Sequence, residues 1–173
     1  MTRDRQSTMI QYSHSKGLNV IMNAWDPDDV LSGSDVQLNA NDIYLLESYL
    51  VSNGTYRSFE EWKTKSDKCA NYQKTLGVKM ACLSTPKTND QFTQAWFGTA
   101  MYNFDYFQAT EIDYSSRNNN LTFTPNPSSD YETVWESDIM TSNTTYFSRS
   151  TNSWILSIAG DGHSWGYGNF TRK

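Results

Sequence analysis

Four short apolar runs, each ending in polar residues, constrain the fold of this chain more than any other feature. The runs are Leu18–Asn23, Asp42–Ser48, Val78–Ser84 and Asp105–Glu111. Their spacing of roughly 25 to 35 residues is the length of one strand followed by one crossover helix. The pattern therefore predicts an α/β fold of consecutive βα units with a parallel sheet. In such sheets the residues that end each strand line the ligand site.

Helix signals occupy the segments between these runs. Residues 3–16 are expected to be helical, with Gly17 as the left-handed residue that ends the helix. Ser58 and Glu61 have the spacing of a capping box and open a long helix. Gly77 is placed to end that helix directly before the third apolar run.

The pattern changes beyond residue 114. Residues 115–130 are loop-like, with a short strand suggested at 121–124, and a helix is expected over 130–140. The apolar run Trp154–Ala159 predicts a terminal strand, which a glycine-rich segment follows. We expect one domain over residues 1–173, with regular βα units over 3–114 and an irregular tail plus terminal strand over 115–173.

The composition excludes two classes of partner and favours a third. The net charge is −5 and the basic residues are scattered, so no nucleic-acid interface is expected. The apolar stretches are too short to cross a bilayer, so no membrane span is expected. The chain has six tryptophans and 11 tyrosines, which suits a carbohydrate ligand because aromatic rings pack on the C–H faces of sugars. This composition indicates a secreted or cell-surface protein, although residues 1–16 show no signal-peptide pattern.

Cofactors are not indicated by the sequence. Cys69 and Cys82 lack the spacing of a metal site or a redox motif, and we favour two buried thiols over a disulfide. The glycine-rich segment 160–168 lacks the spacing of a phosphate-binding loop. We therefore expect neither a metal ion nor an organic cofactor.

Two of the apolar runs carry a family resemblance. Val20-Ile21-Met22-Asn23 and Asp42-Ile43-Tyr44-Leu45-Leu46-Glu47-Ser48 resemble successive strands of the endo-α-1,4-polygalactosaminidase-like (β/α)-barrel glycosidases. In that family a strand of two hydrophobic residues, any residue and Asn precedes a strand that begins with Asp and ends in Glu-Ser or Glu-Thr. The resemblance covers residues 17–111 and, loosely, the tail. It implies the C-terminal half of a TIM-type (β/α) barrel that acts on polysaccharide.

The resemblance also implies an incomplete site. The family's fourth strand, which carries an Asp proposed as a catalytic carboxylate, would lie upstream of Met1. Four regular units and a terminal strand are too few for an eight-stranded barrel, which takes about 250 residues. The chain is therefore either half of such a barrel or a complete open α/β sheet. An open edge beside residues 18–23 would be exposed or covered by another chain, which would permit self-association.

Glu47 is the first candidate for a catalytic residue. It follows an apolar strand at the carboxyl end, where an isolated carboxylate is costly unless it faces a polar cleft. The alternative is a structural carboxylate bound to a neighbouring loop. Asp26 follows the adjacent strand and could pair with Glu47 at the separation that glycoside hydrolysis needs. Its alternative role is to cap a short helix, in the segment Asp26-Pro27-Asp28-Asp29.

The other candidates also follow predicted strands. Glu111 is a reserve catalytic residue, because a shift of one residue in register would turn it away from the cleft. Asn23, Trp25 and Ser84 are expected to bind substrate. The sequence thus predicts a glycoside hydrolase-like protein that is incomplete as a catalyst over residues 1–173. The alternative is a non-catalytic carbohydrate-binding or structural surface module.

Overall fold

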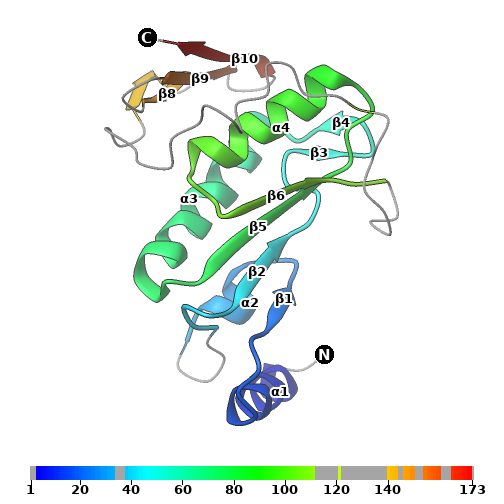
Figure 1. The fold of residues 1–173 in the computed structure, drawn as a ribbon, viewed down its shortest axis with the longest axis vertical. Coiled ribbons are helices and arrows are strands. Elements are labelled where there is room, and N and C mark those ends of the chain that lie inside the picture. Colours follow the sequence, from blue (N-terminus) through cyan, green and yellow to red (C-terminus); the bar gives the residue numbers. More distant parts are fainter. Residues whose placement is uncertain are drawn as a thin grey trace.

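A computed structural model describes residues 3–33, 38–111, 121, 140–143, 146–150, 154–160 and 165–172 (Figure 1). The helices are α1 (Arg3–Ser15), α2 (Asp28–Leu31), α3 (Phe59–Leu76) and α4 (Asn89–Met101). The first six strands are β1 (Ile21–Asn23), β2 (Ile43–Leu46), β3 (Val51–Ser52), β4 (Thr55–Tyr56), β5 (Lys79–Ser84) and β6 (Tyr106–Ala109). The last four are β7 (Met140–Asn143), β8 (Tyr146–Ser150), β9 (Trp154–Gly160) and β10 (Trp165–Arg172).

The four predicted βα strands form one parallel sheet in the order β1-β2-β5-β6. Ile21 is aligned with Ile43, Leu46 with Cys82, and β5 pairs with β6 in the same parallel sense. This arrangement confirms the prediction of an α/β chain with strands parallel and adjacent in sequence order. In the described part of the chain the sheet is open.

The two faces of this sheet differ in burial. Tyr44, Leu46, Met80 and Cys82 point to one face and are fully buried, and helices α3 and α4 lie against that face (Figure 1). The opposite face includes Ile21, of which 66% is exposed. Buried and exposed side chains alternate along each strand because successive residues point to opposite faces of the sheet. The core therefore lies between the sheet and the helices.

The helix signals in the sequence are confirmed. The Ser58 hydroxyl accepts from the Glu61 backbone N–H and the Glu61 carboxylate accepts from the Ser58 backbone N–H, which completes the capping box. Gly77 and Gly17 both have φ of +70° and end α3 and α1 in the left-handed conformation. Helix α4 begins at Asn89 after a cap by Thr88, whose hydroxyl accepts from the Gln91 N–H.

A short hairpin, β3–β4, lies between β2 and α3 and was not predicted. Its turn residues Asn53 and Gly54 have φ of +49° and +72°, as a two-residue hairpin turn requires. A Cβ atom at Gly54 would lie 2.7 Å from Cδ of Lys87, so a larger residue would displace the Lys87 side chain and would also be strained at this positive φ. The Gly54 N–H donates to the Thr85 carbonyl at 2.9 Å, which fixes the hairpin beside the end of β5.

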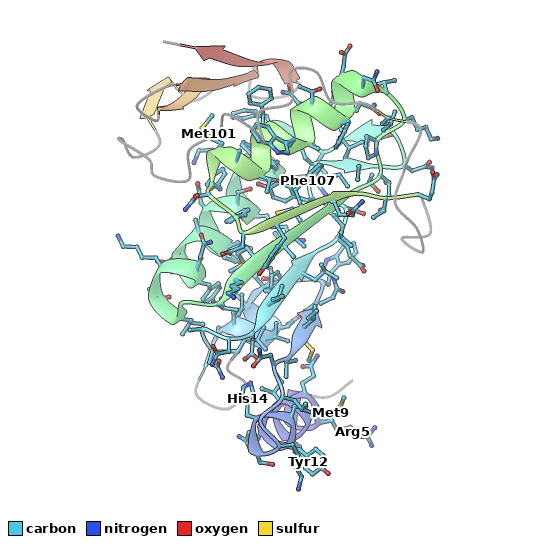
Figure 2. The ribbon with its side chains drawn as sticks, viewed as in Figure 1. Arg5, Met9, Tyr12, His14, Met101 and Phe107 are labelled. Carbon is cyan, nitrogen blue, oxygen red and sulfur yellow. The ribbon has the colours of Figure 1, made fainter. Side chains whose placement is uncertain are left out.

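Helix α1 is attached at the amino ends of the strands. The Asp42 carboxylate has no exposed surface and accepts hydrogen bonds from Val20 N–H and Asn39 N–H, each at 2.8 Å. His14 Nε2 lies 2.8 Å from the same carboxylate. Figure 2 shows His14 on the side of α1 nearer the sheet and Tyr12 on the far side. Asp42 therefore connects α1, β1 and β2.

The tail forms a second sheet, an antiparallel meander in the order β10-β9-β8-β7. Strand β9 confirms the strand expected at Trp154–Ala159, whereas the rest of the tail was expected to be irregular. Strands β9 and β10 approach α4 (Figure 1). Most of the expected strand at 121–124 and the expected helix over 130–140, up to residue 139, lie outside the described residues.

The two cysteines and the apolar character of the helices were also considered in the sequence. Cys69 and Cys82 are free and buried, as expected, and burial raises the pKa of Cys69 to about 12. No described helix is both long enough and apolar enough to cross a membrane.

Candidate functional site

A cleft of about 420 Å³ lies at the carboxyl ends of β1 and β2. We call it the strand-end cleft. Its walls come from the residues that follow these two strands and from the beginning of α3. The lining residues are Asn23, Ala24, Trp25, Glu47, Ser48, Arg57, Glu61 and Lys65. Three of the residues expected at the site from the sequence (Asn23, Trp25 and Glu47) thus share one cleft.

Asn23 and Trp25 form the β1 side of this cleft. The Asn23 amide group donates to the Leu45 carbonyl at 3.0 Å, which fixes the side chain and leaves its carbonyl oxygen as an acceptor. Trp25 is 92% exposed. Tryptophan is usually well buried in folded proteins, so Trp25 presents an unusually large apolar surface to solvent.

Glu47 enters the cleft from the end of β2. The chain turns directly after it, because Ser48 has φ of +49°, and the Glu47 side chain is half-buried. Its carboxylate forms no hydrogen bond or ion pair with any described residue. The alternative of a structural carboxylate held by a neighbouring loop therefore has no support among the described residues, and Glu47 is available to a ligand.

Two basic side chains line the same cleft. Arg57 Nε donates to the Ser48 carbonyl, so the guanidinium is attached to the turn that follows Glu47. Lys65 is half-buried on α3. Burial, followed by the nearby positive charge of Arg57, holds the pKa of Lys65 below its usual value. The Lys65 amine forms neither a hydrogen bond nor an ion pair with a described residue.

Glu61 supplies a second carboxylate, and the sequence interpretation missed its place in the cleft. Its Oε2 accepts from the Ser58 backbone N–H at 3.3 Å, as the capping box requires. The missed signal was the position of the capping box. It opens the helix that follows β2, so Glu61 and Lys65, one helical turn apart, lie beside the strand ends.

Asp26 lines an adjoining cleft of about 390 Å³, which shares Trp25, Glu61 and Lys65 with the strand-end cleft. Its Oδ1 accepts from the Asp28 backbone N–H and from Lys68 Nζ, each at 3.0 Å. These hydrogen bonds hold the pKa of Asp26 below its usual value. Asp26 thus binds the N–H group of the first residue of α2 and forms an ion pair with Lys68, and it does not line the cleft that holds Glu47.

The other two candidates do not join this site. Ser84 has no exposed surface, and its hydroxyl accepts long hydrogen bonds of 3.4 and 3.5 Å from the Leu50 and Val51 backbone N–H groups. Ser84 lines neither cleft, so the structure does not bring it together with the other candidates, and its contact with substrate stays a prediction. Glu111 is half-buried after β6, at the opposite edge of the sheet from β1, and it lines neither cleft.

The strand-end cleft therefore combines one exposed indole ring with acidic, basic and amide side chains. This is the composition of a site for a polar ligand that also has an apolar face. In the described part of the chain, no group of three or more histidine, cysteine, aspartate or glutamate residues could hold a metal ion. Comparisons of the chain with protein-family models, with curated proteins and with solved structures found no match.

Proposed function

We propose that this chain binds carbohydrate in the strand-end cleft and, over residues 1–173, lacks a complete hydrolase site. The observation that carries the proposal is Trp25, which is 92% exposed at a cleft whose other side chains are mostly polar. An indole face packs on the C–H face of a sugar ring, and both surfaces then leave water. A sugar is apolar on its ring face and polar at its rim, which matches this arrangement.

The polar groups of the cleft suit the hydroxyl groups of a sugar. The Glu47 carboxylate and the Asn23 carbonyl oxygen have no donor among the described residues, and both accept hydrogen bonds. A carboxylate accepts from hydroxyl groups with roughly twice the strength of a neutral acceptor. A ligand ring on Trp25 would have its hydroxyl groups within the same cleft as these two acceptors.

Hydrolysis needs two carboxyl groups, one on each side of the scissile bond. Glu47 is available for one of these roles. Asp26 is bound to Lys68 and to the Asp28 N–H, and Glu61 is bound to the Ser58 N–H. Since both partners already have structural roles, the proposal is a glycosidase-like cleft that binds polysaccharide without turnover in residues 1–173.

The proposal extends to the architecture and the location of the protein. A half of a TIM-type (β/α) barrel is supported by four consecutive parallel strands, by helices on one face of the sheet, and by exposed Ile21 on the other. In a closed barrel that second face would line the interior, which side chains from all eight strands fill. Self-association through the β1 edge is the alternative. The proposed carbohydrate ligand, together with the aromatic composition, favours a secreted or cell-surface protein.

Calorimetric titration with neutral oligosaccharides tests the binding proposal. We expect binding to the wild-type chain and about tenfold weaker binding to Trp25→Ala, since one stacked ring contributes roughly 1 kcal/mol. Tyr12→Ala is the matched control, because Tyr12 is 64% exposed on the distant helix α1. Equal weakening by both substitutions, or no binding to any oligosaccharide, would contradict the proposal.

An assay of reducing-end release tests the absence of turnover. We expect no hydrolysis by the wild-type chain under conditions where it binds the oligosaccharide, because Glu47 is the only carboxylate lining the described strand-end cleft that has no partner among the described residues. Hydrolysis that both Glu47→Gln and Asp26→Asn abolish would show that the site is complete. Hydrolysis that survives Glu47→Gln would remove Glu47 from the proposed chemistry.

A further inference from the structure

The three lysines on the middle of α3 have different electrostatic partners. Lys68 forms ion pairs with Asp26 at 3.0 Å and with Asp28 at 2.9 Å. Lys63 forms an ion pair with Asp67, four residues along the helix. Lys65 lies between them in sequence and lines the strand-end cleft, yet it has no ion pair with a described residue.

Lys65 is also the lysine for which an unpaired charge is least favourable. Its side chain is half-buried, and removal of an ammonium group from water is unfavourable unless an opposite charge replaces the lost hydration. Arg57 adds a second positive charge in the same cleft. Burial, which is the larger cause, and the positive charge of Arg57 together lower the pKa of Lys65.

The acidic side chains of the cleft do not neutralise this charge. Glu61 is bound to the Ser58 backbone N–H, and neither Glu61 nor Glu47 forms an ion pair with Lys65 in the structure. An anionic group on the ligand would provide what the cleft lacks. A neutral sugar would leave Lys65 unpaired, and an amino sugar would add a third positive charge beside Arg57 and Lys65.

On the basis of the proposed carbohydrate function, we propose that the strand-end cleft binds an acidic saccharide. A uronic-acid residue places its carboxylate against Lys65 and Arg57, its ring on Trp25, and a hydroxyl group on Glu47. Arg57 Nε donates to the Ser48 carbonyl, which holds the positive charge of Arg57 at the lining of the same cleft as Lys65. In this arrangement Lys65 and Arg57 select a saccharide that carries a carboxylate, and Glu47 orients the sugar ring.

The test compares three trisaccharides of the same ring and linkage: α-1,4-linked galacturonic acid, galactose and galactosamine. Each is titrated calorimetrically into the full chain at pH 7 and low ionic strength. We expect trigalacturonate to bind at least tenfold more tightly than the neutral trimer, and this preference to decrease as salt screens the charges. Binding of the galactosamine trimer should be the weakest.

Three variants assign the preference to Lys65. In Lys65→Gln the acidic and neutral trimers should bind with affinities within about threefold of each other, whereas Lys65→Arg should keep the preference. Lys63→Gln is the matched control, because it removes the same charge from the same helix outside the cleft. If Lys65→Gln and Lys63→Gln both kept the preference for the acidic trimer to the same extent, the assignment of that preference to Lys65 would be overturned.

The remaining outcomes separate this inference from the proposed function. Equal binding of acidic and neutral trimers, both weakened by Trp25→Ala, would overturn the acidic ligand and leave the carbohydrate site in place. Preference for the galactosamine trimer would overturn the inference in the same way. Absence of binding by all three trimers, together with the neutral oligosaccharides, would overturn both.

Discussion

At the scale of single residues, Lys65 and Lys68 show how neighbouring positions on one helix acquire different roles. Lys68 binds Asp28 and Asp26, and these hydrogen bonds raise the pKa of Lys68 above its usual value. The Tyr72 hydroxyl and Lys68 lower the pKa of Asp28. Lys65, in contrast, faces the cleft without a partner. Lys68 therefore stabilises the fold, and Lys65 is available for a ligand.

The Lys68 cluster predicts a pH-dependent contribution to stability. The pKa values of Asp26 and Asp28 are lowered from 3.8, so their contribution is present above pH 3.8 and is lost as the pH falls through their folded-state values. The raised pKa of Lys68 keeps the contribution present up to the unfolded-state pKa near 10.5. Because the groups are partly exposed, we expect Lys68→Gln to lower the free energy of unfolding by only about 0.5–1 kcal/mol at pH 7.

Urea unfolding of Lys68→Gln and the wild-type chain between pH 2.5 and pH 7 checks this prediction. The difference between them should decrease toward the acid end, because the carboxylates become protonated as the pH falls through their lowered pKa values. Lys74→Gln, an exposed position on the same helix, should show a small difference that does not depend on pH. A deficit for Lys68→Gln that is as large at pH 2.5 as at pH 7 would contradict the assigned ion pairs.

At the scale of elements, local chemistry decides where the helices end. Gly17 and Gly77 end α1 and α3 with the same φ of +70°, but their surroundings differ. A Cβ atom at Gly17 would meet nothing within 4 Å, whereas one at Gly77 would lie 3.1 Å from the Ala40 Cβ. The two positions therefore separate backbone strain from side-chain crowding.

Alanine substitutions at these two glycines form a matched pair. Gly17→Ala should lower the free energy of unfolding by about 1 kcal/mol, the strain of a left-handed alanine. Gly77→Ala should lower it further, because Ala40 must also move. Chemical unfolding curves measure both effects. A smaller loss at Gly77 than at Gly17 would show that the contact with Ala40 does not restrict this turn.

The elements that the sequence predicts are those whose signals are local. The capping box at Ser58 and the glycine at 77 depend on a few adjacent residues, and the parallel strands are visible as apolar runs. The meander was mostly missed because β7 and β8 have few apolar residues and β10 contains Gly166 and Gly168, which lower strand propensity. The β3–β4 hairpin was overlooked even though Asn53-Gly54 is a strong hairpin signal.

The candidate site was predictable in part for a related reason. Asn23, Trp25 and Glu47 follow strands, so the rule that strand ends line the site identified them. Arg57, which lies between β4 and α3, and Lys65 on α3 reach the cleft because this segment passes beside the ends of β1 and β2. That contact depends on packing between distant segments, which the spacing of apolar residues does not report.

At the scale of the whole molecule, we assign separate roles to the two ends of the parallel sheet. Asp42 and Glu47 belong to one apolar run, yet they lie at opposite ends of β2. Asp42 is fully buried and binds His14 and two backbone N–H groups, so the amino end is devoted to stability. Glu47 has no partner among the described residues, and the carboxyl end is where we propose that a ligand binds.

A two-dimensional ¹H–¹⁵N titration with an oligosaccharide tests this division most directly. We expect chemical-shift changes at the Trp25 indole N–H and at the backbone amides of Ala24 and Ser48, which line the strand-end cleft. The amides of Gly77 and Asn103, which precede β5 and β6 at the amino end, should stay unchanged. Shift changes confined to the amino end or to the meander, or no change at saturating ligand, would contradict a carbohydrate site in the strand-end cleft.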